Sequence, residues 1–66
     1  MDPNATWHEM AEAVANDDWE TATQRAEDLL SWLDRGGFPP QITGHKEFDK
    51  LAARNACDAV AAWDVV

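Results

Sequence analysis

The chain has 66 residues, of which thirteen are acidic and five are Lys or Arg, so its net charge is −8. That length allows one domain, and a domain this small buries only about 60% of the surface of its unfolded chain. An acidic surface repels nucleic-acid phosphates and anionic membranes, so we expect no direct binding to either.

Cys57 is the only cysteine, which excludes an internal disulfide and a paired-cysteine zinc site. No apolar run approaches the ~20 residues that span a bilayer, and no basic segment followed by an apolar one begins the chain. We therefore expect a cytoplasmic protein with no cofactor.

The first helix is predicted at about residues 6–15, after a short lead-in over residues 1–5. Thr6 and Glu9 have the spacing of a capping box, in which each side chain binds a backbone N–H group of the first turn. Apolar residues then recur at the three- and four-residue spacing of one helix face: Trp7, Met10, Ala11 and Val14.

The second helix is predicted at about residues 17–35. Asp17 and Glu20 form another candidate capping box, and Asn16 suits a left-handed residue in the short turn before it. At the other end Gly36 can take the left-handed conformation that closes a helix. Six apolar residues share one face: Trp19, Ala22, Ala26, Leu29, Leu30 and Leu33.

Residues 36–43 are predicted to connect this hairpin to a third helix at about residues 44–64. The apolar face that we assign to the third helix is rich in alanine: Phe48, Leu51, Ala52, Ala56, Ala59, Trp63 and Val66. On that assignment Cys57 points away from the core and is exposed and unreactive. The predicted fold is all-α, a three-helix bundle in which residues 1–66 form one domain and the third helix packs across an antiparallel hairpin.

Two residues allow two interpretations each. Trp32 lies to one side of the leucine face, where it either covers the connector with Arg25 stacked on its ring or is an exposed anchor for another chain. Asn55 lies in the assigned apolar face of the third helix, and is either a solvated polar residue at the edge of the packing or a buried amide that fixes the register of a helix pair.

The residues that could perform catalysis are few. There is no Tyr, and Ser31 has no histidine near it in the sequence. His8 with Glu12 and His45 with Asp49 have the i, i+4 spacing of metal ligands, but this spacing is more typical of solvent-facing pairs. We therefore predict a non-enzyme with no metal site, and give a metal-dependent enzyme fragment the last place among the hypotheses.

Residues 7–33 resemble a single tetratricopeptide-type helical hairpin. The first helix carries Trp7, and the second opens with the acidic–aromatic–acidic run 18–20 before its small residues. The resemblance implies hairpin geometry and a protein-binding role. It ends at residue 33, because residues 41–66 hold one helix where a second repeat would need two.

The function expected from the sequence is a small acidic protein–protein interaction or assembly module. The alternative is an acidic inhibitor or nucleic-acid mimic that binds a basic protein. The partner's identity is not encoded in any motif, but we expect a homodimer, because three short helices cannot cover every large apolar residue. The candidate interaction residues are Trp32, Asn55, Val60 and Trp63, and Val65 and Val66 would also lack cover.

Overall fold

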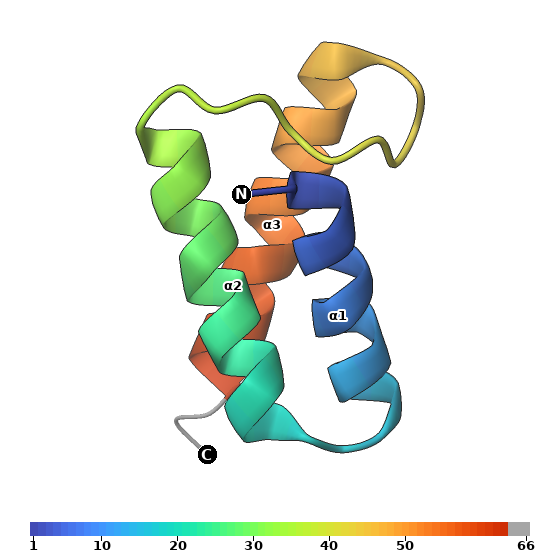
Figure 1. Cartoon of the computed structure of the whole chain (residues 1–66), viewed down its shortest axis with the longest axis vertical. Helices are drawn as coiled ribbons and strands as arrows, with labels where there is room; N and C mark the ends of the chain where they lie inside the picture. The colour runs from blue at the N-terminus through green and yellow to red at the C-terminus, as the bar shows by residue number, and fades with distance from the viewer. Residues whose placement is uncertain (64–66) are drawn as a thin grey trace.

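Three helices make up the fold in a computed structural model that describes residues 1–63. They are α1 (Pro3–Ala15), α2 (Trp19–Asp34) and α3 (Lys46–Trp63), and no strand occurs among the described residues. Figure 1 shows α1 and α2 side by side and antiparallel, with α3 behind them and running back along α2. The predicted all-α three-helix bundle is confirmed. The predicted end of the third helix at residue 64, and both terminal valines, lie outside the described residues.

The first helix begins at Pro3, three residues earlier than predicted. Asp2 is its N-cap, with its carboxylate accepting hydrogen bonds from the backbone N–H groups of Asn4 at 3.0 Å and Ala5 at 3.4 Å. Thr6 lies inside the helix and its hydroxyl donates to the carbonyl of Asp2 at 3.1 Å, so the capping box predicted there is wrong. The reason is that proline suits the first helical position, where no backbone N–H group is needed.

The turn between α1 and α2 is shifted by one residue from its prediction. Asp17, not Asn16, takes the left-handed conformation, with φ of 57°. Asp18, not Asp17, caps α2 by accepting a hydrogen bond from the N–H of Thr21 at 3.2 Å. At the other end the prediction for Gly36 is confirmed, because its φ is 84° and its N–H donates to the carbonyl of Leu33.

The core lies between the three helices. Its buried cluster joins Met10 of α1, Ala26 and Leu29 of α2, and Cys57 of α3. Three partly buried residues pack against it: Trp7, Leu30 and Val60. Every helix therefore contributes at least one buried apolar side chain to a single core.

The third helix is rotated about its axis relative to the prediction. Its buried residues are Asp49, Ala53 and Cys57, so the expectation of an exposed Cys57 is wrong. Phe48 and Leu51, assigned to the core, are 61% and 55% exposed. The buried side carries the small side chains of Ala53 and Cys57, which allow α3 to approach α2 closely.

Candidate functional site

The connector between α2 and α3 is fastened to all three helices. The indole N–H of Trp32 donates to the carbonyl of Phe38 at 2.8 Å, and the N–H of Gln41 donates to the side-chain oxygen of Asn4 in α1 at 2.7 Å. Asp49 of α3 provides the third attachment. These contacts fix where α3 begins, and therefore which of its sides faces the core.

Asp49 is a buried carboxylate, 4% exposed, in the first turn of α3. One of its oxygens accepts hydrogen bonds from the hydroxyl of Thr43 at 2.6 Å, from the N–H of Thr43 at 2.5 Å and from the N–H of Ile42 at 3.2 Å. The hydroxyl bond, followed by the backbone bonds, holds the pKa of Asp49 below its ordinary value of 3.8. Asp49 therefore acts as a charged acceptor that holds the connector.

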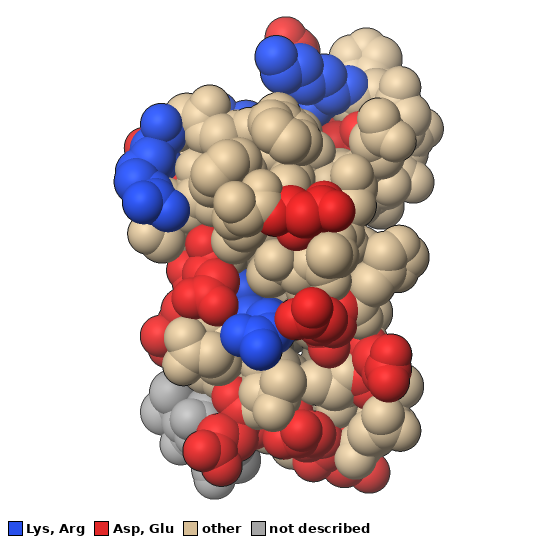
Figure 2. All heavy atoms as spheres, in the orientation of Figure 1, with Lys and Arg blue, Asp and Glu red and all other residues tan. Residues whose placement is uncertain are grey.

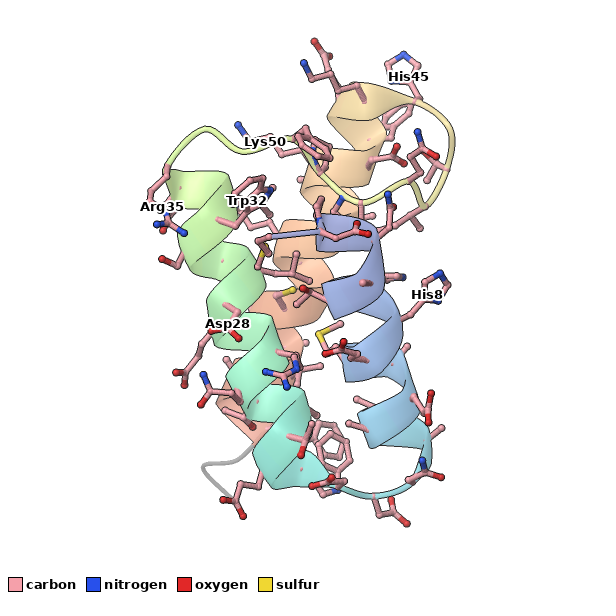
Figure 3. All side chains as sticks on the ribbon, viewed as in Figure 1. His8, Asp28, Trp32, Arg35, His45 and Lys50 are labelled. Atoms are coloured by element: carbon pink, nitrogen blue, oxygen red, sulfur yellow. The ribbon has the colours of Figure 1, made fainter. Side chains whose placement is uncertain are left out.

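Trp32 belongs to this connector packing. Its ring lies edge-on to Phe38, with centroids 5.7 Å apart, and it lies beneath the connector in Figure 3. A Cβ atom at Gly37 would overlap the indole ring, so the backbone passes Trp32 where only glycine fits. Of the two interpretations of Trp32, the structure therefore favours cover for the connector, while Arg25 pairs with Glu9 at 2.7 Å.

The side of α3 that faces away from the core is a candidate interaction surface. We call it the outer face of α3 and define it by exposed residues at helical spacing: Phe48, Leu51, Asn55, Ala59 and Ala62. Phe48 and Leu51 line a shallow hollow of about 390 Å³ together with polar neighbours: Glu47, Lys50 and Arg54. The outer face is thus apolar except at Asn55, and it is charged along one edge.

The four predicted interaction residues are not gathered in one place. Asn55 lies on the outer face of α3, and Trp63 lies at its edge, 61% exposed, with its ring stacked on Trp19 at a centroid distance of 5.4 Å. Val60 packs against the core, and Trp32 lies under the connector. Phe48 and Leu51 were missed as surface residues, although a second set of small apolar residues on α3 could have revealed them: Ala53, Cys57 and Val60.

Charge is distributed unevenly between the two ends of the bundle. Four of the five cations lie toward the end that carries the connector: Arg35, Lys46, Lys50 and Arg54. The opposite end carries acidic side chains from the turn and its neighbours: Glu12, Asp17, Asp18, Glu20 and Asp58. Figure 2 shows this on one face, where most of the acidic side chains lie in the lower half.

Within residues 1–63 no three His, Cys, Asp or Glu side chains come together to hold a metal ion. His8 points outward from α1 and His45 lies beyond the connector, at the start of α3 (Figure 3). Asp49, four residues after His45, accepts hydrogen bonds from the N–H and the hydroxyl of Thr43 in the connector. None of the helices described is long and apolar enough to cross a membrane.

Comparison with known proteins found no matching family model, no similar curated protein and no similar solved structure.

Proposed function

We propose that this protein is a small, non-catalytic protein–protein interaction or assembly module that binds its partner through the outer face of α3. One observation carries the proposal: Phe48 and Leu51 are neighbours on this face and each exposes more than half of its side chain. Contiguous apolar residues at the surface of a small protein mark a site of association.

The composition of α3 strengthens this proposal. The helix buries the carboxylate of Asp49 on its inner side and leaves Phe48 and Leu51 in water on its outer side. Fully burying a side chain of that size is worth about 1.5–3 kcal/mol, of which the isolated chain gains only a part. A partner that covers both side chains would recover the remainder.

Site-specific photocrosslinking in the native cell tests the proposal. A photoreactive residue at Leu51 should give covalent protein adducts, whereas one at Ala11, exposed on α1, should not. The two positions are matched because both are helical, exposed and apolar. Absence of adducts at Leu51, or equal adducts at both positions, would contradict the proposal.

A second candidate function has support from the charge distribution. The acids at the end of the bundle opposite the connector would suit an inhibitor or nucleic-acid mimic that binds a basic protein. In the same experiment a photoreactive residue at Glu20 discriminates the two functions. Adducts at Glu20 in place of Leu51, lost at high salt, would favour the acidic mimic.

The resemblance of residues 7–33 to a tetratricopeptide-type hairpin agrees with a protein-binding role. In this proposal the protein works in the cytoplasm, where its one thiol stays reduced. A homodimer is one form that the assembly could take.

A further inference from the structure

We propose that the outer face of α3 binds a second copy of this chain, with the two helices antiparallel and a two-fold axis passing through Asn55. This inference rests on the proposed function, because it names the occupant of the same face. Three features support it: the spacing of the outer residues, the order of their sizes, and the placement of charge along α3.

The spacing is symmetric about Asn55. Going outward from Asn55, the next outer residues are four positions away, Leu51 and Ala59, and the next are seven positions away, Phe48 and Ala62. A two-fold axis at Asn55 therefore sets every outer position of one helix opposite an outer position of the other. Symmetric dimers require such a self-complementary surface.

The sizes of the outer residues fit only the antiparallel orientation. It places Phe48 opposite the partner's Ala62, and Leu51 opposite the partner's Ala59, so that each large side chain meets a small one. A parallel pair would place Phe48 against its own copy at one end and alanine against alanine at the other. Such a pair would be overpacked at one end and empty at the other.

Asn55 has the chemistry that a residue on this axis needs. Its exposed carboxamide carries both a donor and an acceptor, so each copy can donate its side-chain N–H to the side-chain oxygen of the other. A single asparagine in an apolar helix pair fixes the register, because any slip leaves a buried amide without a partner. The proposed axis therefore passes through the one polar residue among the five that define the outer face.

Charge along α3 also favours antiparallel packing. Arg54 and Asp58 lie on the same edge of the outer face, one on each side of the axis position, so the axis brings Arg54 near the partner's Asp58 twice. Arg54 already pairs with Asp34 at 2.7 Å, but the guanidinium group has further N–H donors. A parallel pair would instead set this edge of the two copies on opposite sides of the interface, where Arg54 and the partner's Asp58 could not meet. The net charge of −8 opposes any association, so high salt should strengthen the dimer.

The first test is sedimentation equilibrium of the full chain at high salt, from micromolar to millimolar concentration. Ala59→Glu should raise the dissociation constant of the dimer about tenfold or more, because it places two unpaired carboxylates in the interface. Ala11→Glu, the same change at an exposed position of α1, should leave the constant unchanged. A wild-type chain that stays monomeric throughout, or a dimer that both variants weaken equally, overturns the inference.

The second test measures the axis directly and does not need Ala59→Glu to fold. Under mild oxidation Asn55→Cys should form a disulfide-linked dimer, because the two Cβ atoms at a two-fold axis come within about 4 Å. His8→Cys, on the outward side of α1, is the control, and Cys57 does not compete because it is fully buried. Equal yields from the two variants overturn the inference.

The outcomes separate this inference from the proposed function. If the chain is monomeric but Leu51 crosslinks to a different protein in the cell, the second copy is excluded and the interaction module stands. If Leu51 crosslinks to nothing, both proposals fail. An adduct with the mass of two copies agrees with both.

Discussion

The sulfur atoms of Cys57 and Met10 lie 3.8 Å apart, and join α3 to α1 across 47 positions of sequence. Both residues belong to the buried cluster, in which Cys57 has no exposed surface. Burial, with a smaller contribution from the charge of Asp58, raises the pKa of the Cys57 thiol from 9.0 to about 11. The thiol is therefore part of the core.

The raised pKa of Cys57 predicts a loss of stability in alkali. Between pH 9 and about pH 11 the unfolded chain releases the thiol proton and the folded chain keeps it, so the free energy of unfolding falls as pH rises. Urea unfolding across this range should show that fall in the wild type and a weaker one in Cys57→Ala. All other residues are the same in the two proteins, so the difference between their pH profiles reports on Cys57. Identical pH profiles for the two proteins would contradict the assignment of Cys57 to the core.

The lowered pKa of Asp49 predicts a loss of stability in acid. Its pKa is lowered in the folded protein, so its stabilising contribution is complete above about pH 4 and is lost as the pH falls below 3.8 through the folded value. Thermal unfolding measured from about pH 5 downward should be less pH-dependent in Asp49→Asn than in the wild type. Glu47→Gln, at an exposed neighbouring position, is the control and should keep the wild-type profile. If both variants showed the same weakened dependence of thermal stability on pH, the stabilising contribution assigned to the Asp49 carboxylate would be wrong.

Alanine at position 36 and alanine at position 37 should destabilise the protein for different reasons. Gly36→Ala should destabilise the protein by about 1 kcal/mol, because alanine is strained in the left-handed conformation of this position. Its Cβ atom would meet no neighbour, so the backbone strain is the whole effect. Gly37→Ala should instead displace the indole of Trp32, and a second substitution, Trp32→Ala, should relieve that overlap. Chemical unfolding followed by circular dichroism measures both effects. Wild-type stability of Gly36→Ala would disprove the explanation of how α2 ends.

The orientation of α3 is tested by the same substitution at two leucines. Leu29 is fully buried and Leu51 is 55% exposed, so Leu29→Ala should cost roughly 2–5 kcal/mol of stability and Leu51→Ala should have a small effect. Denaturant unfolding at low protein concentration separates this effect from any association through the outer face. A large loss of stability for Leu51→Ala at that concentration would mean that α3 is oriented as first predicted.

Sequence periodicity was sufficient to predict the number of helices, their approximate bounds and the buried face of α2. Gly36 could also be predicted, because its position after the last leucines requires a left-handed residue. The predicted helix starts differ from the observed ones by two or three residues. Near the starts of α1 and α2 several residues have side chains that can cap a helix: Asp2, Thr6, Asp17 and Asp18. Local sequence does not determine which of these acids or hydroxyls meets the free N–H groups.

The rotation of α3 could not be predicted from its periodicity. Both sides of the helix have a helical repeat, and the larger residues, Phe48 and Leu51, lie on the side that remains exposed. The contacts that orient α3 involve residues outside the helix. The hydroxyl of Thr43 in the connector donates to Asp49, and the sulfur of Met10 in α1 contacts the sulfur of Cys57. Because the candidate site is the side that these distant contacts leave free, its location followed only from the assembled fold.

The close passage of Gly37 over Trp32 links the evolution of two positions. While position 32 holds an indole ring, selection can accept only the residue without a side chain at position 37, since any Cβ atom would overlap the ring. Once a lineage replaces the tryptophan by a smaller residue, that restriction disappears and position 37 becomes free to vary. Among descendants of this chain we expect a change at residue 37 to follow a change at residue 32 and seldom to precede it.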